Sequence, residues 1–172
     1  MGWTGETTPG IECFFFGSFR IQGGYILSKV EDFLLLNGDG TATDQENDVQ
    51  WSLKDSRQLL GKWLNWDEAN AYVQGCNEQK FLGFDDWRLP TKSELRSLFR
   101  NKDLYRKVFL NLPEKVQRSV SNYQAGGETS YWSSETRYGS FAWKVYFPTA
   151  KEICVDQTVS TTGTSARLVR DS

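Results

Sequence analysis

Histidine is absent from the sequence. Imidazole is the general base of Ser-His-Asp and Cys-His catalysis, a common zinc ligand, and the side chain whose ordinary pKa lies nearest neutral pH. The absence therefore excludes histidine-dependent nucleophilic catalysis, histidine-ligated zinc and a histidine-based pH switch.

Cysteine is scarce, and long apolar runs are missing. Cys13, Cys76 and Cys154 are odd in number and far apart, with no CxxC motif, so they imply neither a zinc site nor a disulfide scaffold. We expect mostly buried free thiols and a reducing compartment. Residues 1–6 lack the basic and apolar regions of a signal peptide, and the apolar run at 13–16 is far below a membrane span. A cytoplasmic location is favoured, and an extracellular one stays open if the natural N-terminus is longer.

Net charge is small but unevenly distributed. The formal charge of −2 gives no reason to expect nucleic-acid binding. Residues 1–55 contain three Lys/Arg against nine Asp/Glu, whereas residues 92–118 contain eight against three. This basic segment is either a solvated helical face or a docking surface for an acidic partner or polyanion. Its candidate patch residues are Arg96, Arg100, Lys102, Arg106 and Lys107.

The N-terminal half alternates short strands with turns. A chain of 172 residues fits one domain. Residues 1–32 are predicted to be an N-terminal extension containing a hairpin around Gly23-Gly24. Short strands are expected at 33–36, 41–44 and 49–51, followed by a polar loop at 54–62.

The turn at Asn37-Gly38-Asp39-Gly40 needs a choice between two interpretations. Asn37, Asp39, Gly40 and Glu46 match four positions of a calcium-binding EF-hand loop. The first ligand position would be Leu35, which cannot bind calcium, and no helix pattern flanks the segment. We therefore predict a β-hairpin turn and no metal site.

Two helices are predicted from their first turns. Asn65 with Glu68 forms one capping box, and the helix then runs from 66 to about 79. Its buried stripe would be Ala69, Tyr72, Val73 and Cys76. Thr91 with Glu94 forms a second capping box before a helix over 92–100. Pro90 keeps the preceding residue out of the helical region.

The C-terminal part is predicted to be mostly strands and loops. Residues 121–140 are rich in Ser, Asn, Gly, Thr and Tyr. Residues 131–134, 141–147, 151–155 and 166–170 have strand-compatible patterns. Phe141, Trp143 and Val145 alternate with Ala142, Lys144 and Tyr146, which places the two sets on opposite faces.

A series of motifs occurs in a defined order along the chain. They are Asn37-Gly38-Asp39-Gly40-Thr41 with Asp44, Val49-Gln50-Trp51, Trp66 with Glu68-Ala69 and Ala71-Tyr72, Asp86-Trp87-Arg88-Leu89-Pro90-Thr91 with Glu94-Leu95, Tyr131-Trp132-Ser133-Ser134, Ala142-Trp143-Lys144-Val145-Tyr146-Phe147 and Arg167-Leu168-Val169-Arg170. Over about residues 33–170 this pattern resembles the DUF1566 family, also called the Lcl C-terminal domain after a Legionella collagen-like adhesin.

The resemblance implies an α+β domain with a C-type lectin-like fold. Such a domain has two main helices packed on small twisted antiparallel sheets, long loops, and a ligand surface near its C-terminal half. It implies kinship with the formylglycine-generating enzyme and with the variable proteins of diversity-generating retroelements. The domain would span residues 33–172. Many members carry cysteine where this chain has Val73 and Leu168, so a plain apolar contact is expected here in place of a disulfide, which argues against a surface adhesin.

Catalytic chemistry is not expected. The formylglycine-generating relatives need a cysteine pair, and the C-terminal part contains only Cys154. Asp85 and Asp86 are expected to be loop caps or ion-pair partners of Arg88 rather than an acid/base pair. Structural roles are assigned to Asp86, Trp87, Arg88, Pro90, Thr91, Glu94, Trp132 and Trp143, with the tryptophans in the core.

The leading hypothesis is a non-enzymatic recognition module that presents a C-terminal loop surface to a protein or glycan partner. Tyrosine with Ser, Gly and Asn is typical of adaptable binding surfaces. The candidate contact residues are Tyr123, Tyr138, Lys144, Tyr146 and Lys151. One alternative is a structural subunit of a larger complex, of a phage receptor-binding or bacterial defence type. Another is a polyanion binder acting through the basic segment. No cofactor, metal or membrane is implied.

Overall fold

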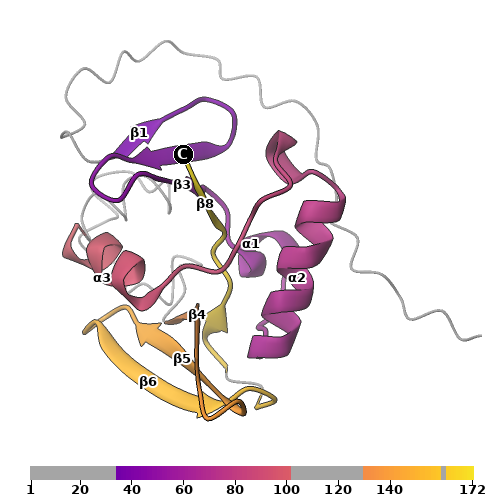
Figure 1. Cartoon of the computed structure of the whole chain (residues 1–172), viewed down its shortest axis with the longest axis vertical. Coiled ribbons are helices and arrows are strands. Elements are labelled where there is room, and N and C mark those ends of the chain that lie inside the picture. The colour runs from indigo at the N-terminus through magenta and orange to yellow at the C-terminus, as the bar shows by residue number, and fades with distance from the viewer. Residues whose placement is uncertain (1–33, 102–129, 160–161) are drawn as a thin grey trace, which may run out of the picture.

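The computed structural model describes residues 34–101, 130–159 and 162–172 (Figure 1). The predicted hairpin within residues 1–32 lies outside the described residues, as do Lys102, Arg106, Lys107 and Tyr123. The described residues form an α+β fold with two four-stranded sheets and a few helices. No helix among them combines the length and apolar character needed to cross a membrane.

The first sheet contains β1 (Leu34–Leu36), β2 (Thr41–Asp44), β3 (Val49–Ser52) and β8 (Val169–Asp171), in that order and all antiparallel. The hairpin turn predicted between β1 and β2 is confirmed. The Asp39 carboxylate accepts hydrogen bonds from both the backbone N–H and the hydroxyl of Thr41, at 2.9 and 2.6 Å. Both bonds go to Asp39 Oδ1, which therefore closes the turn, as Asp side chains commonly do.

The second sheet has the order β6-β5-β4-β7. Its strands are β4 (Ser130–Arg137), β5 (Phe141–Tyr146), β6 (Lys151–Asp156) and β7 (Thr164–Ser165). The hairpins β4–β5 and β5–β6 are antiparallel, but β7 pairs parallel to β4, so the expectation of purely antiparallel sheets is wrong for this edge.

The last predicted strand, 166–170, begins too early. Residues 166–168 lie between β7 of one sheet and β8 of the other. Here the Ala166 carbonyl accepts from Ser56 N–H and the Leu168 carbonyl from Ser52 N–H. The chain is crossing between the sheets at this point, so its regular strand starts only at Val169.

The helices are α1 (Ser56–Leu60), α2 (Trp66–Glu78), the 3-10 turn η1 (Phe81–Gly83) and α3 (Lys92–Arg100). Both predicted capping boxes are present, with Asn65–Glu68 starting α2 and Thr91–Glu94 starting α3. The predicted loop at 54–62 is wrong, because Asp55 and Gln58 form a third capping box and start α1. Gly61 ends α1 with a φ of 71°, a left-handed conformation that glycine adopts without strain.

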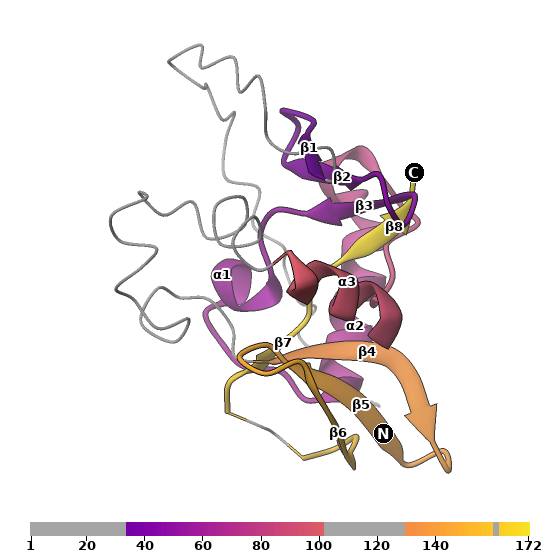
Figure 2. The same ribbon diagram turned by 90° about the vertical axis from the view of Figure 1, so that its left-hand side faces the viewer.

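Two apolar clusters form the core. One joins the first sheet to Leu95 and Leu98 of α3 and to Tyr131 and Val145 of the second sheet. Figure 2 shows α3 between the two sheets. The other cluster packs α2 against the opposite face of β4 and β5, through residues that include Trp132 and Ala142. The central hairpin of the second sheet is therefore covered on both faces along part of its length.

Candidate functional site

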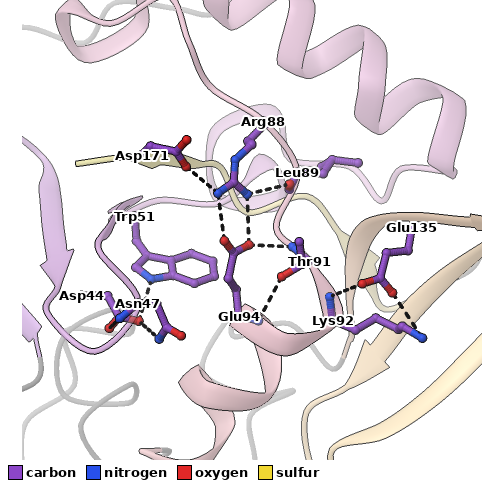
Figure 3. A network of polar contacts seen from close by, with 10 residues as sticks. All are labelled: Asp44, Asn47, Trp51, Arg88, Leu89, Thr91, Lys92, Glu94, Glu135 and Asp171. Carbon is purple, nitrogen blue, oxygen red and sulfur yellow. Dashed lines mark hydrogen bonds and ion pairs between the residues drawn. The ribbon is translucent and has the colours of Figure 1, made fainter.

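The segment Asp86–Thr91 leads from η1 to α3, and Arg88 is its main polar anchor. The Arg88 guanidinium donates to both carboxylate oxygens of Glu94, at 3.0 and 2.8 Å, and to Asp171 at 2.7 Å (Figure 3). The Arg88 and Val169 backbones also exchange two hydrogen bonds. Arg88 thus ties the start of α3 to the last strand.

Glu94 has two roles in the same place. Its carboxylate accepts from Thr91 N–H at 2.7 Å as part of the capping box, while it pairs with Arg88. Burial alone would raise the pKa of Glu94, but the hydrogen bonds and charge of Arg88 and the Thr91 N–H outweigh it and lower that pKa. The hydrogen bond to Glu94 raises the pKa of Arg88. Both groups are charged near neutral pH.

Pro90, in the Asp86–Thr91 segment, and Trp66 both bind a bulge in β4. The β4–β5 register shifts between Trp132 and Thr136. Within this interval Ser134 N–H donates to the Pro90 carbonyl at 2.8 Å, and Trp66 Nε1–H donates to the Ser133 carbonyl at 2.9 Å. A bulge bends a strand and increases its twist, so these two bonds set the direction in which the far end of the hairpin points.

Lys92, at the start of α3, lies over the face of the sheet. Its ammonium contacts Glu135 at 3.2 Å and Glu152 at 3.1 Å, and lies 4.2 Å from the centre of the Trp143 ring. Partial burial opposes the charge, but the hydrogen bonds that Lys92 donates to Glu152 and Glu135 prevail and raise the pKa of Lys92. This cluster connects α3 to β4, β5 and β6.

Next to this cluster, the β4–β5 hairpin carries a group of aromatic and basic side chains, most of them exposed. We call Arg137, Tyr138, Phe141 and Trp143 the hairpin-tip surface. Arg137 and Phe141 are paired across the hairpin, and Trp143 follows two residues later, so the three share one face of the sheet. Tyr138 is 83% exposed and Phe141 41% exposed, whereas Trp143 is half-buried.

Tyr138 is strained as well as exposed. It opens the three-residue loop between Arg137 and Phe141 with a φ of 53°, in the left-handed region that disfavours bulky side chains. The Arg137 guanidinium lies 4.8 Å from its ring centre and donates to its hydroxyl at 3.3 Å. The ring is exposed to water, lies on a strained backbone and contributes little to the core. Strained residues of this kind are found at contact sites.

The structure does not bring the predicted contact residues together. Tyr138 lies at the hairpin tip, whereas Tyr146 and Lys151 face each other across β5 and β6 at the opposite end of the sheet. Lys144 is buried, so the expectation that it is a surface residue is wrong. Its ammonium donates to the Thr164 hydroxyl at 3.1 Å, and burial lowers its pKa. Alternation assigned Lys144 to a face but could not show that β7 and α2 cover that face.

Arg137 and Phe141 are contact candidates that the sequence analysis missed. The run Arg137-Tyr138-Gly139-Ser140-Phe141 contains a glycine between two strand-like segments, which is a hairpin signal. Placing the turn there would have put Arg137 opposite Phe141.

The described part of the basic segment is largely paired with carboxylates. Arg96 contacts Glu152 at 2.7 Å, and Arg100 contacts Glu46 at 3.4 Å. Both are surface contacts, yet they reduce the positive charge that a polyanion would meet. The other three candidates of this patch lie outside the described residues.

The three tryptophans assigned to the core lie at different depths. Trp87 and Trp132 are core residues, with 2% and 0% exposure, whereas Trp143 is only half-buried. Asp85 and Asp86 do not pair with Arg88, so that expectation is wrong. Asp86 accepts two hydrogen bonds from Arg170, which lower the pKa of Asp86, and Asp85 lies 3.5 Å from Lys80. Arg88 is instead occupied by Glu94 and Asp171.

A buried ion pair was also missed. Arg167 and Asp55 are both fully buried and lie 3.0 Å apart, and Asp55 also accepts from the Tyr131 hydroxyl at 2.9 Å. Arg167 donates to the Ser52 and Leu53 carbonyls, both at 2.9 Å. These bonds join α1, β3 and β4 to the crossing segment, and nothing local in the sequence predicts them.

Metal-binding groupings are absent from the described residues, where no three His, Cys, Asp or Glu side chains converge. Of the two cysteines there, Cys76 is buried and Cys154 is half-buried. Val73 and Leu168, the positions at which the family resemblance implied a lost disulfide, both pack in the cluster around α2.

Comparison with known families gives a match over most of the chain. The model of the Lcl C-terminal domain aligns with residues 40–170, about three quarters of the chain and nearly all of its described part. Comparison with curated proteins gives no match.

Proposed function

The chain belongs to the Lcl C-terminal domain family, and from this and the geometry of the hairpin tip we propose that it is a recognition module without catalytic activity. In this proposal the hairpin-tip surface binds a protein or glycan partner. The core, the ion pairs of Arg88 and the bulge in β4 hold that surface in one orientation.

Tyr138 carries the proposal. The residue is 83% exposed, and its backbone has a positive φ. A left-handed conformation costs a non-glycine residue about 1–2 kcal/mol, and no core contact offsets that cost here. Rigid aromatic rings next to an arginine are enriched among the residues that dominate binding interfaces.

We further propose a C-type lectin-like fold over residues 33–172, with residues 1–32 as an extension. The two longer helices α2 and α3, two small sheets and a loop-rich C-terminal half support this assignment. The absence of histidine, and the ion-paired state of Arg88, Glu94 and Lys92, support a scaffold rather than a reaction centre.

Site-specific photo-crosslinking tests the binding surface. A photoreactive phenylalanine analogue replaces Tyr138 in the full chain, which is then expressed and irradiated in its native host. Thr149, exposed in the turn at the opposite end of the sheet, receives the same analogue as a control. We expect a discrete adduct from position 138 and none from position 149.

A parallel binding measurement covers glycans, which crosslink poorly. The wild type and Tyr138→Asn are compared on a glycan array and against any captured protein. Affinity should fall by about tenfold or more in the variant. Adducts from position 149 alone, or equal binding by both chains, would contradict the placement.

A further inference from the structure

Among the described residues, strand β6 is an edge of the second sheet, and β7 is the other edge. Strand β6 is six residues long and pairs with β5 on one side. Figure 1 shows β6 as the outermost strand at the base of the molecule. Of the other sheet edges in the described residues, β1 has three residues and β7 has two, and β8 is paired with Arg88 on its outer side.

The direction of each backbone group of β6 follows from one hydrogen bond. Gln157 N–H donates to the Ser140 carbonyl at 3.1 Å, in register with the β5–β6 ladder. Because the bonded residues of an antiparallel pair recur every second residue, 151, 153 and 155 also point toward β5. Glu152, Cys154 and Asp156 therefore direct their N–H and C=O groups outward.

Most of these outward backbone groups have no hydrogen-bond partner within the described residues. The Asp156 carbonyl accepts from Val159 N–H, at 3.4 Å. The backbone groups of Glu152 and Cys154 and the N–H of Asp156 make no hydrogen bond within the described residues. A row of donors and acceptors with the two-residue repeat of a strand is matched by another extended polypeptide, because a glycan offers no such repeat.

The side chains beside this edge differ on its two faces. Glu152, Cys154 and Asp156 lie on the face that carries Trp143 and Phe141, with Cys154 opposite Trp143 and Asp156 opposite Phe141. The small Cys154 side chain lies between the carboxylates of Glu152 and Asp156, and its cross-strand neighbour is Trp143. On the other face, Ile153 and Val155 are half-buried and apolar.

We propose that an extended segment of a protein partner adds to β6 as a fifth strand, and that this segment reads apolar–basic–apolar. The inference rests on the proposed recognition function and names the partner class. The basic residue lies opposite Cys154, near Asp156 and the Trp143 ring, and its two neighbours pack beside Ile153 and Val155. A hydrogen bond from the Thr158 hydroxyl lowers the pKa of Asp156, which keeps that carboxylate charged.

A second copy of the chain fits this edge less well. Self-pairing centred on Cys154 places Glu152 of one copy opposite Asp156 of the other. Like charges directly opposite each other destabilise a strand pair.

A proline substitution tests the outward-facing backbone of β6 without changing the rest of the fold. Cys154→Pro removes an outward N–H and leaves the ladder to β5 intact, because proline is tolerated on edge strands when its nitrogen faces solvent. Cys154→Ser keeps the N–H and is the matched control. The probe is a displayed library of random peptides, long enough to span β6 and selected on the wild-type full chain.

The proposal expects enriched peptides with an apolar–basic–apolar core. Their affinity should fall by about tenfold or more in Cys154→Pro and stay within about threefold in Cys154→Ser. Amide exchange of Glu152, Cys154 and Asp156 in the wild type should slow when peptide binds, a readout that holds even if Cys154→Pro does not fold.

Four outcomes overturn the proposal. They are an empty selection, peptides that bind Cys154→Pro equally well, unchanged exchange at the three amides, and a dimer in solution that Cys154→Pro dissociates. Crosslinks at position 138 that persist in Cys154→Pro remove strand addition alone. If the analogue at position 138 gives no crosslinks in a chain that is otherwise wild type, the proposed function itself is overturned.

Discussion

At the scale of single residues, Tyr138 and Lys144 both occupy positions that disfavour them. Tyr138 combines high exposure with a positive φ, and Lys144 places an ammonium inside the second sheet. Residues that cost stability without evident return to the fold are the first places to look for function. Substitutions at Tyr138 and at Lys144 test separately whether each residue lowers the stability of the fold.

Tyr138→Asn should stabilise the fold and weaken partner binding. Asparagine tolerates the left-handed conformation, so the free energy of unfolding should rise by about 1 kcal/mol, as measured by urea denaturation. Tyr138→Ala is the matched control, since alanine removes the ring and keeps the strain. If both variants are equally stable, strain at this position is not significant.

Lys144→Met should also raise the free energy of unfolding, by about 1 kcal/mol or more. Burial lowers the pKa of Lys144 below its ordinary 10.5, so the unfolded state binds the proton more tightly. The cost is therefore complete below the folded pKa and disappears as pH rises above 10.5. Lys151→Met, exposed on the same sheet, should change stability by less than about 0.5 kcal/mol. A destabilised Lys144→Met would instead indicate that the cation is needed.

At the scale of elements, α3 begins where a local signal and a long-range contact coincide. Thr91 and Glu94 lie three residues apart and form the capping box without help from the rest of the chain. Arg88 and Asp171 are brought together only by folding, at 2.7 Å. The start of α3 is thereby fixed to β8, and through Pro90 to the bulge of β4.

Glu94→Gln should change how stability depends on pH. The folded pKa of Glu94 lies below its ordinary 4.5, so its contribution is complete above that value and is lost as pH falls through the folded pKa. Denaturation between pH 7 and 3 should show a smaller acid loss in the variant, which is also less stable at pH 7 by about 1–2 kcal/mol. Glu135→Gln, at a more exposed pair, should lose less than about 1 kcal/mol at pH 7. Identical pH profiles for wild type and Glu94→Gln would refute the assignment.

At the scale of the whole molecule, the buried Asp55–Arg167 pair joins parts of the chain that are distant in sequence. Asp55 caps α1, Tyr131 belongs to β4, and Arg167 lies in the segment that crosses between the sheets. Because all three are fully buried, water cannot replace a lost partner. The pair therefore fixes how the two sheets meet.

Arg167→Met should destabilise the fold by about 3–5 kcal/mol, since it leaves the Asp55 carboxylate buried without its cation. Thermal and urea unfolding measure the loss. Arg170→Met is the matched control, because Arg170 pairs with the half-exposed Asp86 and should cost about 1 kcal/mol. A loss below about 1 kcal/mol for Arg167→Met would show that this pair does not hold the sheets together.

Short-range chemistry made much of the fold predictable. The capping boxes of α2 and α3, the β1–β2 turn and the strands β5 and β6 all depend on residues a few positions apart, so local patterns predicted them. The same chemistry at Asp55 and Gln58 was present but was interpreted as a polar loop. The ordered motifs also identified the family, which the comparison confirmed over residues 40–170.

Tertiary structure alone decided which faces are covered and which ions pair. Strand alternation assigns Lys144 and Trp143 to opposite faces, but only the packing of other elements decides that Lys144 is buried. Arg88 had nearby carboxylates at Asp85 and Asp86, yet it binds Glu94 and Asp171. The physical reason is range: hydrogen bonds within a turn are determined by a few adjacent dihedral angles. Burial and ion pairing depend on where distant segments meet, and so the hairpin-tip surface and the outward edge of β6 became visible only in the folded chain.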